Sequence, residues 1–180
     1  MADIKQTIQD FYRVAQDRDF LRSFQFRVLD VSNQGVPVLS QEDLIYVTTS
    51  TLPSRSIQMF DVPFMGLNFH VPGTASYPGS EGYALNFRSD SEASLRKIFE
   101  DWSNSIFNDE TSSGDFKIHA DSTITLALLD QDHNTTQLYT LYGVFPVDVG
   151  TLDFDITQGA QAVNFSTTLA YQYWRRRGLS

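Results

Sequence analysis

The sequence predicts a mainly β (α+β) protein: a β-rich domain with one packed helix and a further helix at the N-terminus. Apolar and polar residues alternate almost without interruption from Val163 to Trp174, which is typical of a long, half-buried strand. Fourteen Phe and eight Tyr are many for 180 residues, and aromatic side chains favour strands. A single apolar stripe at helical spacing within Ser89–Phe107 indicates the packed helix.

Composition narrows the function classes. The formal net charge is −9, which argues against a sequence-independent nucleic-acid binder, because such proteins need a basic surface. With Arg175–Arg177 set aside, 10 basic and 22 acidic residues remain, a balance of −12. The chain has no cysteine, no apolar run near the roughly 18–20 residues of a membrane span, and no apolar signal core in MADIKQTIQD. We therefore expect a soluble protein that is made in a cytoplasm and does not itself bind membranes.

The first fifty residues predict a helix and two strands. Asp3 is the expected N-cap of a short amphipathic helix, Asp3 to Gln16, and a helix this short needs a surface to cover its apolar stripe. The strands are expected at Arg22–Val31 and Leu44–Thr49, and Asn33-Gln34-Gly35 breaks the chain between them. The apolar stripe of the helix consists of Ile4, Ile8, Phe11, Tyr12 and Ala15.

The next segment, Ile57–Val71, is extended and unusually apolar. Pro63 and Gly66 interrupt it, which predicts an edge or hairpin segment rather than a central strand. Two prolines and three glycines predict a loop over Val71–Gly82, and a strand follows from Tyr83 to Phe87.

The packed helix is expected to begin with a capping box. Ser89 and Glu92 have the spacing of that motif. The apolar stripe behind it consists of Leu95, Ile98, Phe99, Trp102 and Ile106. A strand over Ser122–Leu129 and a turn at Asp130–Asn134 follow the helix.

The C-terminal quarter predicts a sheet with one apolar and one polar face. Leu138–Val144 is the strand expected after the turn at Asp130–Asn134. Pro146 and Gly150 predict a corner in the chain after that strand. Beyond the corner, Leu152, Phe154 and Ile156 alternate with Asp153 and Asp155 before the long last strand. No linker divides the chain, so we expect a single domain over 1–180. Its parts are an N-terminal helix at 1–17, a β-rich core at 22–174 and a basic tail at 175–180.

Side chains that could carry chemistry form no convincing set. His70, His119 and His133 are far apart and have no ligand spacing. Asp130–Asn134 lacks the glycine and the distal glutamate of a calcium loop, so a solvated hairpin turn explains it better. Asp153 and Asp155 would lie side by side on the polar face of a strand, which is common without catalysis. We expect no enzyme activity, no cofactor and no metal.

Three stretches resemble the tail tube proteins of contractile-tailed bacteriophages. The first is Thr48–Pro53, a strand that runs into Leu-Pro, and the second is Phe64–Gly73, which precedes the Tyr83–Arg88 strand and the helix with Phe99-Glu100-Asp101-Trp102. The third is Gly143–Asp155, with the last strand after it. Taken together and in this order, the matching stretches span nearly the whole chain from Arg22 to Trp174. The helix segments Asp90–Ala93 and Asp101–Ser105 are also similar to the baseplate proteins that start the tube.

The resemblance implies a tail-tube-like β-sandwich or barrel flanked by a helix. It implies a structural protein of the virion tail, assembled in the host cytoplasm, whose copies form hexameric rings. The sheets of a ring would join into a continuous inner barrel, and the rings would stack inside a contractile sheath. Its partners would be other copies of itself, the sheath protein, the tape-measure protein in the lumen, the baseplate tube-initiator and the tail-terminator, with DNA passing through transiently. A tube-initiator or terminator role, or a β-sandwich binding module of the virion, stays open as an alternative.

Two sets of residues are candidate sites under this interpretation. Carboxylates are rarely buried unpaired, and stacking contacts tolerate little like charge, so we expect a net acidic lumen with Asp61 and Asp121 facing it. The arginines at 175–177 would then lie on the outer or stacking side. The candidate contacts between subunits are Ile4, Ile8, Phe11, Phe64, Met65, Leu67 and Phe69.

Overall fold

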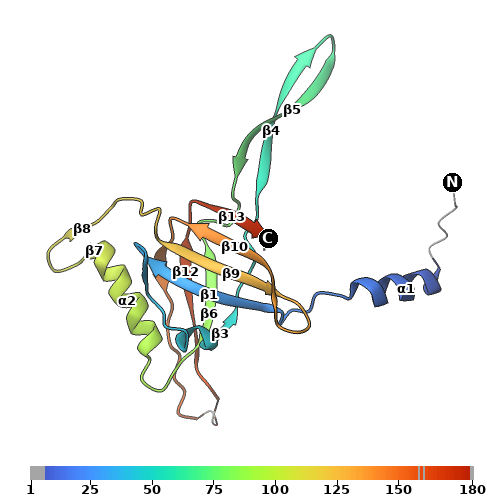
Figure 1. Ribbon diagram of the computed structural model, residues 1–180. Coiled ribbons are helices and arrows are strands. Elements are labelled where there is room, and N and C mark those ends of the chain that lie inside the picture. Colours follow the sequence, from blue (N-terminus) through green and yellow to red (C-terminus); the bar gives the residue numbers. More distant parts are fainter. Residues whose placement is uncertain (1–6, 158, 160, 179–180) are drawn as a thin grey trace.

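Two antiparallel sheets face each other in the computed structural model, which describes residues 7–157, 159 and 161–178 (Figure 1). The first sheet has the order β13-β10-β9-β1-β2 and the second the order β11-β12-β6-β3. The strands of the first sheet are β1 (Phe26–Asn33), β2 (Val36–Pro37), β9 (Thr123–Leu129), β10 (Thr135–Tyr142) and β13 (Tyr173–Gly178). Those of the second are β3 (Val47–Thr49), β6 (Tyr83–Arg88), β11 (Phe145–Val149) and β12 (Asn164–Ala170). This is the β-rich fold that the sequence predicts.

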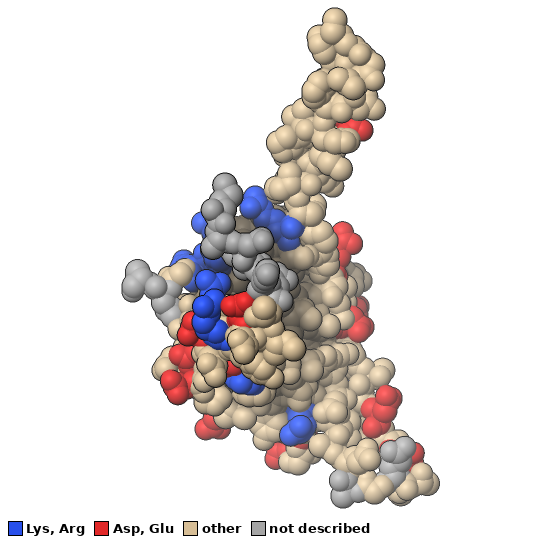
Figure 2. Space-filling view, turned by 90° about the vertical axis from the view of Figure 1, so that its right-hand side faces the viewer, with Lys and Arg blue, Asp and Glu red and all other residues tan. Residues whose placement is uncertain are grey.

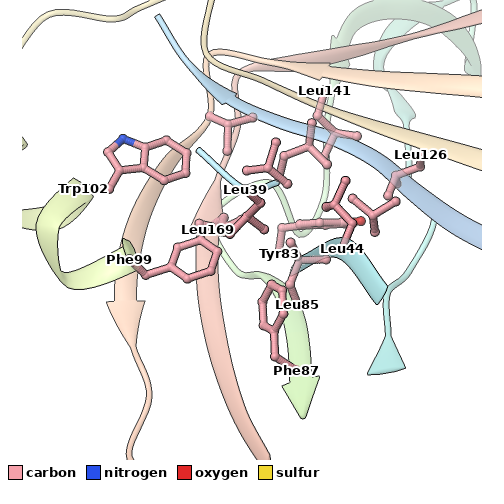
Figure 3. Close-up of a cluster of buried hydrophobic side chains, with 14 of the residues drawn as sticks. Leu39, Leu44, Tyr83, Leu85, Phe87, Phe99, Trp102, Leu126, Leu141 and Leu169 are labelled. Atoms are coloured by element: carbon pink, nitrogen blue, oxygen red, sulfur yellow. The ribbon is translucent and has the colours of Figure 1, made fainter. Parts of the chain in front are cut away.

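The hydrophobic core lies between the two sheets (Figure 3). Alternation explains which side chains enter it, because successive residues of a strand point to opposite faces. In β6 the side chains of Tyr83, Leu85 and Phe87 are buried. Ile124 and Leu141 of the first sheet are fully buried opposite them. The apolar face of each sheet therefore packs against the apolar face of the other sheet.

Helix α2 (Ser94–Ile106) closes one open side of the sandwich. Its buried side chains are Leu95, Phe99 and Trp102, and the Phe99 ring lies 5.4 Å from that of Phe87. The predicted capping box is wrong, because the helix begins five residues later than Ser89. Ala93 precedes it with a φ of 51°, outside helical geometry, and Ser94 donates a hydrogen bond to the Asp90 carboxylate at 2.6 Å. None of the helices within the described residues is long and apolar enough to cross a membrane.

The predicted last strand is two strands in two sheets. β12 ends at Ala170, and β13 begins at Tyr173 after the chain has crossed from the second sheet to the first. At the crossing, the Tyr171 amide donates to the Ser80 carbonyl and the Gln172 amide to the Tyr142 carbonyl, both at 2.9 Å. The expected basic tail is also wrong, because Arg175–Arg177 lie in β13 and pair with Leu138–Thr140 of β10.

Other boundaries differ from the sequence prediction. A short 3-10 helix, η1 (Asp43–Tyr46), replaces the first half of the Leu44–Thr49 strand. The expected corner at Pro146 lies within strand β11, and none of the described residues between Gly150 and Val163 lies in a strand. The first strand begins at Phe26, which leaves Phe24 outside it and 63% exposed.

Two elements project from this body (Figure 1). One is the hairpin of β4 (Ser56–Phe64) and β5 (Leu67–Ser76), whose strands pair only with each other; we call residues 56–76 the arm. The hairpin confirms the sequence prediction, although β5 continues to Ser76 through the first part of the predicted Val71–Gly82 loop. The other projection is α1 (Ile8–Arg18). A smaller hairpin of β7 (Phe107–Asn108) and β8 (Ser113–Gly114) follows α2.

Candidate assembly surfaces

One face of the outer half of the arm, from Phe60 to the tip and back to Val71, is entirely apolar. Residues directly opposite each other in an antiparallel pair share a face. The opposed pairs of this face are Phe60–Val71, Val62–Phe69 and Phe64–Leu67. Apart from the half-buried Val71, these side chains are 41–63% exposed. Soluble monomers rarely expose a continuous apolar strip of this kind, so the face has the character of a contact surface.

The opposite face of the arm is mixed. It carries Met59, Pro63 and Asn68, and an Asp61 carboxylate oxygen lies at hydrogen-bond distance, 2.5 Å, from Nδ1 of His70. Asp61 is the one Asp, Glu, Lys or Arg within residues 56–76, and Figure 2 shows a single acidic group on the arm above a body that carries many charged side chains. The arm is therefore amphipathic, with its apolar side free to be covered.

The tip of the arm is a two-residue turn between Phe64 and Leu67. Met65 and Gly66 both have positive φ, 50° and 81°, which matches the turn to the twist of the flanking strands. The Met65 side chain is 88% exposed. A flexible, polarizable thioether at an exposed tip suits a contact with an apolar partner surface.

Helix α1 exposes its apolar stripe as well. It buries none of its residues, and Ile8 and Phe11 are 75% and 59% exposed. The Phe11 ring stacks on that of Phe20 with centroids 5.9 Å apart. Thr7 caps the helix through a capping box with Asp10. Asp3 and the interface candidate Ile4 lie outside the described residues, and Figure 1 places α1 and the arm far apart on the body.

The second sheet has an unpaired edge on each side. β3 pairs only with β6, and β11 only with β12, among the described strands. Because every neighbouring pair in this sheet is antiparallel, β11 and β3 run in opposite directions. Unpaired strand edges are ready templates for another chain, and these two edges have matching polarity for each other.

The outward face of the second sheet is polar and nearly uncharged. Its cross-strand rows are Asn164–Arg88, Ser166–Asn86 and Asp148–Thr168–Ala84. Arg88 and Asp148 are the charged members of these rows. Short hydroxyl and amide side chains on a wide sheet leave a smooth, water-compatible surface with few groups that could hold an ion.

A groove of about 780 Å³ opens beside β3. We call it the β3 groove. Ile45 and Phe24 at its rim are 81% and 63% exposed, and Arg27 is the one charged residue of its lining. The lining consists of Ser23, Phe24, Phe26, Arg27, Val28, Gln41, Leu44, Ile45, Val47, Thr48, Thr49 and Ser50.

A second cavity, of about 310 Å³, lies between the end of α2 and the segment that follows β8. Asp115 and His119 lie in its wall, with 2.9 Å between the carboxylate and Nε2 of the imidazole. The Lys117 backbone amide, together with His119, holds the pKa of Asp115 below its usual value. The two groups form a hydrogen-bonded pair at the surface, and no third ligand completes a metal site among the described residues.

The remaining candidates are dispersed. Asp130 closes the β9–β10 turn by accepting from the Asn134 and Asp132 backbone amides at 2.8 and 2.9 Å. Those bonds lower its pKa, the Asn134 amide most, which is the hairpin turn that the sequence predicts. The two expected lumen residues are not brought together, because Asp61 lies on the arm and Asp121 in the turn before β9.

The model of the phage tail tube protein family matches residues 20–177 of this chain. The chain belongs to this family. The chain is 22% identical over 169 residues to tail tube protein gp19 of Enterobacteria phage T4, covering 93% of this chain and 98% of the relative. It is 24% identical over 128 residues to a tail tube protein of Serratia phage KSP90, with 71% of each chain covered. As a member of the tail tube family, the chain is a structural component of the virion tail.

Solved structures of tube proteins share the fold. The tube-terminating cap of the anti-feeding prophage aligns with a TM-score of 0.61 at 13% identity, covering 90% of this chain and 93% of that one. A chain of the sheath-tube complex of an extracellular contractile injection system in its extended state aligns with a TM-score of 0.56 at 14% identity. That alignment covers 97% of this chain and 100% of the other. These likenesses show a common tail-tube fold.

Sequence reasoning missed two features of this tail tube protein. The β3 groove joins residues 23–28 to residues 41–50, which only the tertiary fold brings together. Alternation predicts a strand that includes Phe154 and Ile156, yet both lie outside any strand and are 80% and 102% exposed. The sequence signal for Phe154 and Ile156 is a pair of apolar residues in the segment that follows Gly150.

Proposed function

We propose that this chain is the repeating subunit of the inner tail tube, forming hexameric rings that stack into a channel for phage DNA. The observation that carries the proposal is the pair of free, oppositely directed edges of the second sheet, β3 and β11. Joining β11 of one copy to β3 of the next continues the antiparallel sheet. A contact between two different surfaces closes into a ring when the rotation between copies fits, and a closed ring has no remaining edge.

Rings stack through the projecting elements. The arm extends far beyond the body, and its apolar face needs a cover that one copy does not supply (Figures 1 and 2). We assign Phe64, Met65, Leu67 and Phe69 to contacts with a neighbouring ring. Ile8 and Phe11 of α1 serve contacts between subunits in the same way, together with Ile4, which lies outside the described residues.

The outward face of the second sheet lines the channel in this arrangement. Its Asn, Ser and Thr side chains give a hydrated wall, and Asp148 and Arg88 contribute one formal charge of each sign per copy, so the wall is close to neutral and holds phosphates weakly. Asp61 and Asp121 lie outside this sheet, so their predicted lumen position depends on how the rings stack. The tape-measure protein fills the channel during assembly, and the sheath protein covers the outside.

Negative-stain microscopy of the purified chain, combined with sedimentation at rising concentration, tests the proposal. We expect six-fold rings and stacked tubes. Monomers alone at high concentration would overturn it. Single rings that never stack would instead favour the tube-initiator or terminator role, which the similarity of Asp101–Ser105 to baseplate proteins keeps as the second candidate.

A further inference from the structure

We propose that the loop after β11, Gly150–Thr157, of one copy fills the β3 groove of the next copy, with Phe154 and Ile156 as its anchors. This inference rests on the proposed edge-to-edge ring and names a second contact within it. The occupant of the groove is thus a second copy of this chain.

The loop holds its two apolar anchors away from its own body. Its start is fixed, because the Gly150 amide donates to the Ser166 carbonyl at 2.8 Å and Arg96 Nε donates to the Gly150 carbonyl at 3.2 Å. Leu152 packs against the core, whereas Phe154 and Ile156 are 80% and 102% exposed. Two large apolar side chains this exposed, two residues apart, gain from any apolar partner surface.

Strand polarity determines where the loop arrives. When β11 pairs antiparallel with β3 of the next copy, Val149 at the end of β11 comes beside Val47 at the start of β3. η1 directly precedes Val47 and carries Ile45 at the rim of the groove. Figure 1 shows the loop after β11 and the segment with β3 at the same, lower end of the body.

The two surfaces are complementary in polarity and charge. Phe24, Phe26 and Leu44 give the groove an apolar lining, and Arg27 is its one charge. The loop alternates its apolar anchors with Asp153 and Asp155, and residues 150–163 contain no Lys or Arg. The same docking that buries Phe154 and Ile156 therefore brings carboxylates toward Arg27.

Cysteine cross-linking tests the contact directly, because the chain has no native cysteine. In the Ile45→Cys/Phe154→Cys variant, assembled and then treated with a short bismaleimide, we expect a ladder of covalent oligomers on denaturing gels, up to six copies. Each single variant should give no product larger than a dimer. The matched control is Val36→Cys/Phe154→Cys, since Val36 is 66% exposed but lies at the other end of β1. That pair should give no ladder.

Charge variants provide the second measurement. Phe154→Asp should raise the concentration needed for ring formation at least about tenfold, with the thermal melt of the monomer unchanged because the side chain is exposed. Arg27→Asp should weaken rings, and Asp153→Arg in the same chain should restore them. Rings that form normally without cross-links would overturn this inference and leave the tube intact. Failure of the native chain to form rings would instead overturn the proposed function.

Discussion

The indole Nε1 of Trp174 donates a hydrogen bond to the backbone carbonyl of Ser54 at 2.9 Å. Ser54 lies two residues before β4, so the last strand holds the root of the arm. The Ser54 hydroxyl in turn donates to the Pro78 carbonyl at 2.6 Å, which joins the two ends of the arm. Trp174 is itself held by Tyr139, with ring centroids 5.7 Å apart. The body of the protein therefore sets the direction in which the arm leaves it.

Loss of this single donor should loosen the arm. Trp174→Phe keeps an aromatic ring but leaves the Ser54 carbonyl without its partner, at a cost of about 1 kcal/mol in the free energy of unfolding. We expect faster amide hydrogen exchange across residues 56–76, measured by mass spectrometry. Trp102→Phe, a core substitution away from the arm root, is the control: it should lower stability without a selective effect on the arm. Unchanged exchange in Trp174→Phe would show that the root is held by other contacts.

Tyr83 should make the fold sensitive to alkali. Its hydroxyl donates to the Thr51 carbonyl at 2.9 Å and contacts Ser50 Oγ at 2.6 Å. Burial raises the pKa of Tyr83 to about 12, whereas the unfolded phenol ionises near 10. Because the folded pKa is the higher one, the stability linked to the neutral phenol is fully present below pH 10. It is lost as pH rises toward 12, by up to about 3 kcal/mol.

Tyr83→Phe isolates this contribution. The variant should lose about 1–2 kcal/mol at pH 7, because the Thr51 carbonyl loses its donor, but should lose less further stability between pH 8 and pH 11.5 than the native chain. Urea denaturation at the two pH values measures the difference. Tyr12→Phe, at an exposed position, should behave like the native chain. An equal alkaline loss in Tyr83→Phe would assign the effect to other groups, among them Tyr171, whose pKa burial also raises.

A charge on the apolar face of the arm should block stacking but not folding. Phe64→Asp places a carboxylate among exposed apolar side chains, so the melting temperature should hardly change, while tubes should be replaced by single rings. Asn68→Asp adds a negative charge to the opposite face one residue pair away, and it should still allow tubes. Sedimentation velocity and microscopy distinguish the two. Tubes of normal length with Phe64→Asp would remove the arm from the stacking contact.

Gly150 is expected to tolerate no side chain. A Cβ there would lie 2.3 Å from the Ser166 backbone carbonyl, so β11 and β12 would have to separate. Gly150→Ala should therefore destabilise the fold by about 1–3 kcal/mol and weaken rings through the displaced β11 edge. Gly82→Ala, where a Cβ would meet no heavy atom within 4 Å, is the matched control. Equal thermal melts for the two variants would contradict the expectation.

Removal of residues 1–17 should leave a folded domain. Helix α1 buries no residue, so its loss takes no side chain out of the core. We expect an unchanged far-ultraviolet spectrum apart from one short helix, a cooperative melt, and weaker stacking. Loss of the cooperative melt would place the helix in the folded body rather than at a subunit contact.

The alternation of apolar and polar residues predicts the core strands correctly, but it does not predict which sheet each strand joins. Phe165, Thr167 and Leu169 share a buried face as the pattern predicts. The same pattern continues through Tyr171 and Gln172, where the chain changes sheets, because strands on both sides of a corner alternate alike. A period of two carries no information about which sheet a strand joins.

Local signals also compete with tertiary structure at the start of α2. Ser89 and Glu92 have capping-box spacing, but the backbone at Ala93 takes a positive φ and delays the helix to Ser94. For the candidate surfaces, hydrophobicity alone pointed to Phe64, Met65, Leu67 and Phe69, and the structure finds all four exposed. Their role as subunit contacts stays a prediction. The β3 groove cannot be predicted from the sequence, because neither of the two segments that line it has an unusual composition by itself.

The arm leaves the body after β3 and returns to it at β6, two strands that already pair with each other. Its length can therefore change without moving either sheet. Adding one residue to each arm strand would advance the tip by about 3.4 Å but would turn every side chain beyond that point to the opposite face. Only additions of two residues per strand keep the apolar side aligned. The reach of the arm is thus adjustable in increments of about 7 Å, and related chains whose arms differ in length should differ by multiples of that increment.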